Sequence, residues 1–100
     1  MDVQYSKDFV KSMSWLSGKI LHSVISAIQE VKDVRSLEEI SNCKKIETLH
    51  NTYRIRIGSL RAFFILHVHI DGEVVRFEYL VSREEAYNKA NMDKLKNRDE

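Results

Sequence analysis

The feature that most constrains the fold is a strand pattern in the middle of the chain, from Thr52 to Ile70. Residues Tyr53–Ile57 alternate apolar and cationic side chains with a period of two, which is typical of a half-buried β-strand. Gly58-Ser59 follows directly, and glycine supplies the positive φ that the first position of a tight hairpin turn requires. We therefore predict a β-hairpin in which Arg56 lies opposite Arg61.

This register leaves two positive charges facing each other. Like charges directly opposite in an antiparallel pair destabilise it by roughly 0.2–1 kcal/mol. The segment from Thr48 to Ile70 contains no acidic residue that could neutralise them. The formal net charge of the chain is only +1, which argues against a uniformly basic surface but allows a local cationic patch. A bound anion would explain the pair, and we predict an anion-binding site here.

The N-terminal half predicts a helical hairpin. Val3–Tyr5 has the pattern of a short strand, and Ser6 is a good N-cap for a helix that we expect to end at Gly18. Apolar residues then recur at helical spacing between Ile20 and Val31, and we interpret this stripe as a core face that covers the sheet. The fold class that follows is α+β: an N-terminal helical hairpin on a small, mainly antiparallel twisted sheet, with a short C-terminal helix, in a single domain over residues 1–100.

Two shorter signals lie on either side of the central hairpin. Ser36 and Glu39 match a capping box that predicts one or two helical turns, and Lys44–Leu49 are expected as a strand or its approach. Asp71-Gly72 is a strong type I′ turn signal. The pairs expected from that turn are Val68 with Val75, Leu66 with Phe77, Phe64 with Tyr79, and Ala62 with Val81. The combined register of the two hairpins would collect arginines on one sheet face: Arg54, Arg56 and Arg61.

A second capping box, Ser82 to Glu85, predicts a terminal helix that begins at Arg83. Arg83 and Tyr87 are four residues apart and would then share one helical face beside the arginine cluster. The apolar content of this helix is small, so we expect it to be weakly held and Asn97–Glu100 to fray.

These residues suit phosphate chemistry. Guanidinium groups stay charged and donate two parallel hydrogen bonds to phosphate oxygens, and a nearby tyrosine can stack on a base or take part in proton transfer. Lys44 and Lys45 add positive charge just before the arginines. The alternative interpretation is an ordinary solvated surface, which arginines on a strand form about as often. The facing arginines without acids favour the anion site.

The same residues carry a family resemblance. The segment Leu49–Ile65, with its Tyr-Arg-Ile-Arg-Ile-Gly-x-x-Arg-x-x-Phe run, resembles the RelE/ParE-type toxins of bacterial toxin–antitoxin modules, and the ending Arg83-x-x-x-Tyr87 is similar to theirs. The resemblance covers nearly the whole chain. It implies a compact α+β fold and an antitoxin partner that wraps and neutralises the toxin.

RelE-like members cut messenger RNA in the ribosomal A site, where the ribose 2′-hydroxyl attacks the adjacent phosphate without a metal. By position, the resemblance implies that Arg54 and Arg56 grip the RNA backbone and that Arg61 stabilises the charged transition state. Arg83 and Tyr87 match the C-terminal basic and aromatic positions. No cofactor is implied.

The resemblance leaves the activity open in two ways. Many relatives have histidine just before the arginine equivalent to Arg83, and this chain has Ser82. ParE-like members share the fold but poison DNA gyrase, so the alternatives are a gyrase poison or a degenerate toxin that only binds its antitoxin.

The remaining reactive side chains predict no further site. The single cysteine, Cys43, cannot form an internal disulfide, which favours a reducing cytoplasm, and we interpret it as a small core residue. His50, His67 and His69 could meet on one strand face, but we interpret them as half-exposed strand residues and expect no metal site. No apolar run is long enough for a spanning helix, so we expect no membrane association.

Overall fold

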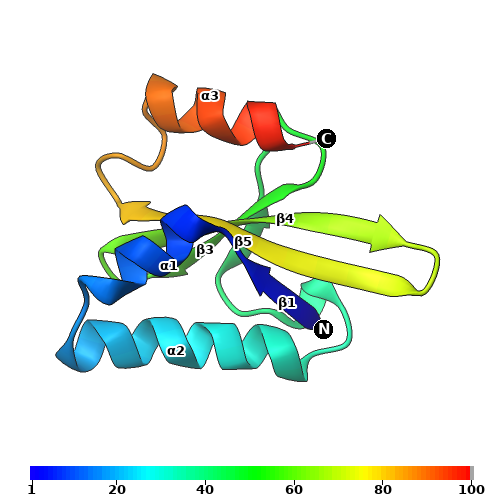
Figure 1. The fold of residues 1–100 in the computed structure, drawn as a ribbon, viewed down its shortest axis with the longest axis horizontal. Coiled ribbons are helices and arrows are strands. Elements are labelled where there is room, and N and C mark those ends of the chain that lie inside the picture. Colours follow the sequence, from blue (N-terminus) through cyan, green and yellow to red (C-terminus); the bar gives the residue numbers. More distant parts are fainter. Residues whose placement is uncertain (100) are drawn as a thin grey trace.

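The computed structural model of the chain describes residues 1–99, and Figure 1 shows its fold as a five-stranded sheet with helices on both faces. In chain order the elements are β1 (Asp2–Tyr5), α1 (Lys7–Ser14), α2 (Gly18–Asp33), a short 3-10 turn η1 (Leu37–Glu39), β2 (Cys43–Lys45), β3 (Thr52–Ile57), β4 (Leu60–His69), β5 (Gly72–Ser82) and α3 (Lys89–Arg98). This is the predicted α+β class.

The sheet order is β1-β5-β4-β3-β2, in which β1 is parallel to β5 and the other pairs are antiparallel. The helical hairpin α1–α2 covers one face and α3 lies across the other (Figure 1). Each face therefore has its own apolar cluster. The larger one packs Phe9 and Val24 of the helical hairpin against Phe64 of the sheet, and the smaller one packs Leu95 of α3 against Phe63.

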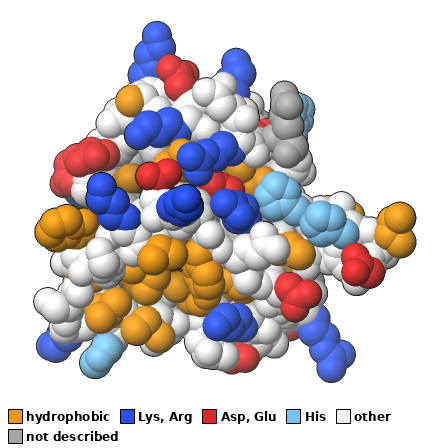
Figure 2. Space-filling model, viewed as in Figure 1, with side chains coloured by type: hydrophobic (Ala, Val, Ile, Leu, Met, Phe, Trp, Pro, Cys, Tyr) orange, Lys and Arg blue, Asp and Glu red, His pale blue; other side chains and the backbone are white. Residues whose placement is uncertain are grey.

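The helical hairpin follows the predicted order with two differences. The first helix already ends at Ser14, and Gly18, whose φ is +61°, begins α2 instead of ending α1. The apolar stripe of α2 is only partly a core face: Val24 is fully buried, but Ile25 is 49% exposed. Ile25 contributes with Val10 of α1 to the apolar surface that Figure 2 shows between the two helices. The predicted capping box at η1 is confirmed, and the strand expected over Lys44–Leu49 is shorter and is confined to β2.

The predicted central hairpin is confirmed. Arg56 pairs with Arg61 across β3 and β4, and Arg54 pairs with Phe63. Gly58 has a φ of +56° in the turn, as its position required. Both arginines of the facing pair therefore project from the face that α3 covers in part.

The predicted register of the second hairpin is wrong. The turn residues are Ile70 and Asp71, because His69 pairs with Gly72, and Val68 lies opposite Glu73. The other observed pairs are Leu66 with Val75, Phe64 with Phe77, Ala62 with Leu80, and Arg61 with Val81.

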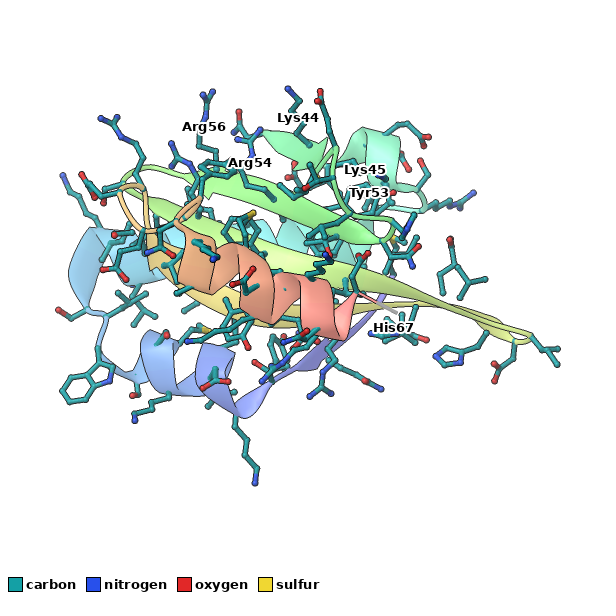
Figure 3. All side chains as sticks on the ribbon, turned by 90° about the horizontal axis from the view of Figure 1, so that it is seen from above. Lys44, Lys45, Tyr53, Arg54, Arg56 and His67 are labelled. Carbon is teal, nitrogen blue, oxygen red and sulfur yellow. The ribbon has the colours of Figure 1, made fainter. Side chains whose placement is uncertain are left out.

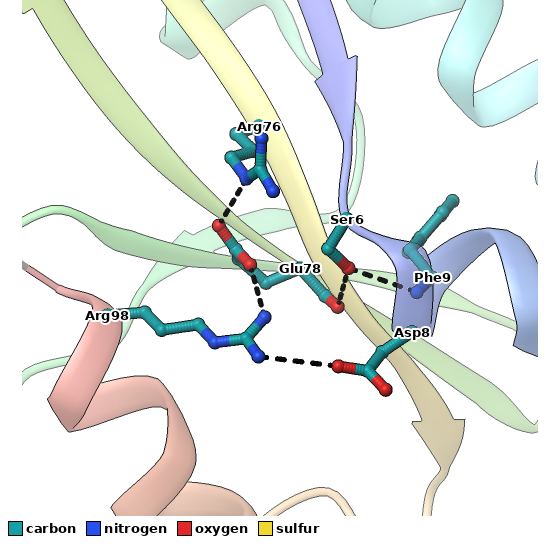
Figure 4. A network of polar contacts seen from close by, with 6 residues as sticks. All are labelled: Ser6, Asp8, Phe9, Arg76, Glu78 and Arg98. Atoms are coloured by element: carbon teal, nitrogen blue, oxygen red, sulfur yellow. Dashed lines mark hydrogen bonds and ion pairs between the residues drawn. The ribbon is translucent and has the colours of Figure 1, made fainter.

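A bulge at Glu78 then changes the register again between Phe63 and Phe64. Because of this additional residue, Phe77 and Tyr79 lie on opposite faces of the sheet although they are two apart in β5, and each packs in the cluster on its own face. The Glu78 side chain is nearly buried and accepts from Arg76 at 3.1 Å and from Arg98 at 2.8 Å (Figure 4).

The predicted start of the terminal helix is also wrong. Ser82 accepts a hydrogen bond from the Glu85 N–H at 3.3 Å, but the chain continues as turns, and α3 begins at Lys89 with Asn88 as its N-cap. The reason is tertiary: Ala86 is fully buried in the α3-side cluster, and its carbonyl accepts from the Asn91 amide at 2.6 Å.

The end of α3 is not loosely held as we expected. Arg98 forms ion pairs with Glu78 and with Asp8 of α1, at 2.8 and 3.3 Å (Figure 4), and the Asp99 side chain is nearly buried. The structure therefore contradicts the expectation of fraying for residues 97–99. Glu100, the last residue of that expectation, lies outside the described residues.

Ser6 joins β1, α1 and the bulge. Its hydroxyl accepts a hydrogen bond from the Phe9 N–H at 3.0 Å, as predicted for an N-cap, and donates to the Glu78 carbonyl at 2.5 Å (Figure 4).

We expect Ser6→Ala to lower the free energy of unfolding by about 1–2 kcal/mol, because a buried cap and a buried acceptor lose their partner. Urea unfolding measures the change. Ser26→Ala, at an exposed position of α2, is the control and should change stability by less than about 0.5 kcal/mol; an equal loss in both variants would contradict the capping role.

Candidate anion-binding site

The confirmed hairpin places the predicted arginines side by side near one end of the sheet. Lys44 of β2 pairs with Arg54 of β3, so a cationic side chain from each strand lies on the same face. Figure 3 shows Lys44, Arg54 and Arg56 along the β2–β3 edge. The edge strand β2, although only three residues long, therefore extends the cationic surface beyond the hairpin.

Arg61 is the most constrained member of this cluster. Arg61 is only 7% exposed. Its guanidinium donates to the carbonyls of Gly58 and Leu60 at 2.9 and 2.8 Å. The pKa of Arg61 lies below its ordinary value, first because burial disfavours the charged form and then because Arg56, Arg54 and Arg83 add positive charge nearby. The charge of Arg61 is thus less favourable in the folded protein than it would be in water.

The cationic cluster of Lys44, Arg54, Arg56 and Arg61 forms no ion pair with a carboxylate of residues 1–99. Within residues 1–99, ion pairs form only among Asp8, Arg76, Glu78 and Arg98. Arg54, Arg56 and Arg61 are in none of these pairs, so their charge is available to an external anion.

A groove of about 410 Å³ opens beside the cluster. Its lining residues are Lys44, Lys45, Ile46, Glu47, Thr48, Arg54, Tyr87 and Met92. Tyr87 is 54% exposed and packs edge-on against Phe63 at 6.1 Å between ring centroids. The groove therefore combines cations for a phosphate with an aromatic ring and aliphatic side chains that suit a base. Glu47 is the acidic residue of the lining and belongs to none of the ion pairs named above.

The structure gives two of the predicted site residues additional contacts. The Lys45 ammonium donates to the carbonyls of Leu49 and Ile46, so it supports the loop that follows β2. Arg83 lies in the turns after β5, and its N–H donates to the Ser59 carbonyl at 2.9 Å, which places it at the turn between β3 and β4. Arg83 and Tyr87 do not share a helical face, but both lie close enough to Arg61 to influence its pKa.

Some lining residues carried no signal in the sequence. Ile46, Thr48 and Met92 reach the groove only because the loop after β2 and the helix α3 approach each other across the sheet. Isolated aliphatic or hydroxyl side chains of this kind have no motif. They could be found only from the fold.

The other reactive side chains lie apart from the groove or are unreactive. Burial raises the pKa of the Cys43 thiol to about 11, so it is almost entirely protonated at neutral pH. His67 and His69 stack at 6.5 Å on the second hairpin, and Figure 3 shows His67 well away from Arg54. Within residues 1–99 no three His, Cys, Asp or Glu side chains gather as a set of metal ligands.

Each helix of residues 1–99 is too short or too polar to cross a membrane.

Comparison with known proteins gives a sequence relative that aligns over most of the chain. The chain is 30% identical over 89 residues to Toxin RelE3 of Methanocaldococcus jannaschii, an alignment that covers 88% of this chain and 97% of that toxin. No family model matches the sequence.

Solved structures of RelE toxins resemble the chain as well. A RelB–RelE antitoxin–toxin complex from Methanococcus jannaschii contains a chain that superposes with a TM-score of 0.65 at 30% identity, over 84% of this chain and 94% of that one. The isolated RelE toxin of E. coli superposes with a TM-score of 0.63 over 96% of each chain, and at 14% identity it shows a shared fold.

Proposed function

The chain belongs to the RelE/ParE toxin family of toxin–antitoxin systems, and from this membership we propose that it is an endoribonuclease that cuts messenger RNA on the ribosome. The observation that carries the proposal is the buried Arg61 among cations that form no ion pair with a carboxylate of residues 1–99. Such an arrangement is unfavourable for the protein alone and becomes favourable when a phosphate is bound.

The proposed reaction uses the RNA itself as the nucleophile. The 2′-oxygen of a ribose attacks the adjacent phosphorus, the bond from phosphorus to the 5′-oxygen breaks, and a 2′,3′-cyclic phosphate is left. One proton leaves the 2′-hydroxyl and one is given to the departing 5′-oxygen. The pentavalent phosphorane formed between these two events carries more negative charge than the starting phosphodiester. Preorganised cations therefore lower its free energy.

Each site residue has a role in this proposal. Arg54, Arg56 and Lys44 hold the RNA backbone at the sheet edge, with Lys45 adding charge while it supports its loop. Arg61 stabilises the phosphorane. Arg83 and Tyr87 position the nucleotide or handle a proton.

Ser82, which stands where many relatives have histidine, cannot supply an imidazole. Its hydroxyl accepts the Glu85 N–H in a turn.

The proposed partners are an antitoxin and the ribosome. A structural neighbour with 30% identity was solved with a RelB antitoxin, which supports an antitoxin for this chain as well. Because the net charge of the chain is only +1, we propose that it docks on the ribosome through the local cationic surface around Lys44, Arg54 and Arg56.

Inducible expression with primer extension on a defined transcript tests the proposal. We expect growth arrest and breaks within translated codons for the wild type, weaker breaks for Arg54→Ala, and wild-type breaks for Arg35→Ala, which removes an exposed arginine outside the site. Intact transcripts with a folded protein would contradict the proposal. Arrest with intact transcripts and gyrase-linked DNA breaks would instead identify a gyrase poison.

A further inference from the structure

Asp99, just after α3, forms an unusually dense set of contacts with the loop between β2 and β3. Its carboxylate accepts from the N–H groups of His50 and Asn51 at 2.6 and 2.8 Å and from the Thr52 hydroxyl at 2.6 Å. Its main-chain carbonyl accepts from the Asn51 side chain at 3.2 Å. The Asp99 residue is only 4% exposed, so these contacts are shielded from water. The loop backbone thus depends on one carboxylate for two of its donors.

The same loop and helix form the two walls of the groove. Residues 46–48 of the loop contribute Ile46, Glu47 and Thr48 to one wall, whereas Tyr87 and Met92 come from α3 and the turns before it. Asp99 is not among the lining residues. Asp99 lies outside the groove, and its hydrogen bonds connect the loop that forms one wall to the end of the helix that forms the other.

The neighbouring residue Arg98 has a different task. It forms ion pairs with Glu78 of β5 and Asp8 of α1 (Figure 4). Its guanidinium also lies 4.8 Å from the centre of the Tyr79 ring. Arg98 therefore attaches α3 to the sheet and to α1, whereas Asp99 attaches the loop to α3. The two attachments can be tested separately.

The carboxylate is well suited to stay charged in this position. Burial alone would raise the pKa of Asp99, but the Thr52 hydroxyl and the N–H groups of His50 and Asn51 outweigh it and hold the pKa below its ordinary value. At neutral pH the hydrogen bonds are therefore made to an ionised acceptor, which makes them shorter and stronger than neutral ones.

From this geometry we infer that Asp99 is a positioning residue for RNA cleavage, which fixes the β2–β3 loop against α3 and so sets the width of the groove; the inference rests on the proposed function. The variant that tests this role is Asp99→Asn, which keeps the size of the side chain. It replaces one acceptor oxygen by an NH₂ group that would face an N–H donor, so the loop loses part of its attachment. Misplacement of a reacting group by about 1 Å can cost on the order of 10²-fold in rate.

The experiment is single-turnover cleavage of a defined messenger RNA on programmed ribosomes, at increasing concentration of purified toxin. We expect Asp99→Asn to lower the maximal rate at least about tenfold, while the half-saturating concentration changes by less than about threefold. This split follows from the proposed function, in which Arg54 and Tyr87 of the groove hold the RNA beside Arg61. A fall in the folded fraction would instead shift the half-saturating concentration. Amide hydrogen exchange at His50 and Asn51 should accelerate about tenfold or more, with Leu95 in α3 unchanged.

Controls keep the outcomes distinct. Asp93→Asn removes the same charge from an exposed position of α3 and should cleave like the wild type. Should Asp99→Asn fail to fold, Thr52→Val removes one donor and should lower the maximal rate about threefold. Wild-type rates in Asp99→Asn despite faster loop exchange, or in a folded Thr52→Val, would overturn the positioning role alone. Absence of cleavage by the wild type itself would overturn the proposed function, and the inference with it.

Discussion

Replacing Arg61 by methionine is expected to remove RNA cleavage while the protein stays at least as stable as the wild type. Loss of one preorganised donor to a developing negative charge costs roughly 10²–10³ in rate. Within residues 1–99 no carboxylate forms an ion pair with Arg61, and burial and neighbouring arginines already disfavour its charge. An apolar side chain of similar length relieves that cost. Activity and stability should therefore move in opposite directions.

Primer extension after induced expression measures the first effect, and urea unfolding of the purified protein measures the second. Arg61→Lys keeps a charge but has no planar fork, so it should recover only part of the activity. Arg98→Met is the contrasting control: it should lower stability, because the buried Glu78 loses an ion-pair partner at 2.8 Å. A large loss of stability in Arg61→Met would show that Arg61 mainly supports the turn through Gly58 and Leu60.

The arginine cluster could be predicted because its hairpin is specified locally. Polar and apolar residues alternate strictly in β3, and the glycine of the turn leaves one favourable register. A slip by one residue would have moved Ile55 and Ile57 from the core to the opposite face. The pairing of Arg56 with Arg61 follows from this constraint, and so does the site's position on the sheet.

The second hairpin could not be predicted in the same way, because both faces of its strands are covered. Residues 61–65 of β4 are all buried, so they contain no alternation that would distinguish one register from the next. The turn signal at Asp71-Gly72 was one residue away from the observed turn, and the bulge at Glu78 has no local signature. Tertiary packing of two clusters decided the register.

The terminal helix shows the same competition between local and tertiary effects. The capping box at Ser82 is a real local preference, and its hydrogen bond to the Glu85 N–H is present. The chain nevertheless delays the helix until Lys89, because Ala86 is buried against the sheet first. Consequently the two predicted C-terminal site residues, Arg83 and Tyr87, come near Arg61 from turns, and no helical spacing relates them.

The second large effect concerns the neighbouring residues Phe63 and Phe64. Neighbours in a strand point to opposite faces, and here both are completely buried because helices cover both faces. Phe64 stacks on Tyr53 at 5.2 Å and meets Phe77 edge-on at 5.7 Å. We expect Phe64→Ala to lower the free energy of unfolding by about 3–5 kcal/mol, since the larger cluster loses a ring and keeps a cavity.

Phe63→Ala should cost a similar amount, about 3–5 kcal/mol, but it should also slow RNA cleavage in the molecules that remain folded, because Tyr87 loses the ring against which it packs. Urea unfolding gives the stabilities, and cleavage is compared below the unfolding transition. Val68→Ala, on the same strand but 72% exposed, is the control and should change stability by less than about 0.5 kcal/mol. If Phe64→Ala were destabilised and Phe63→Ala were not, only the face under the helical hairpin would be a packed core, and α3 would not be packed where the groove requires it.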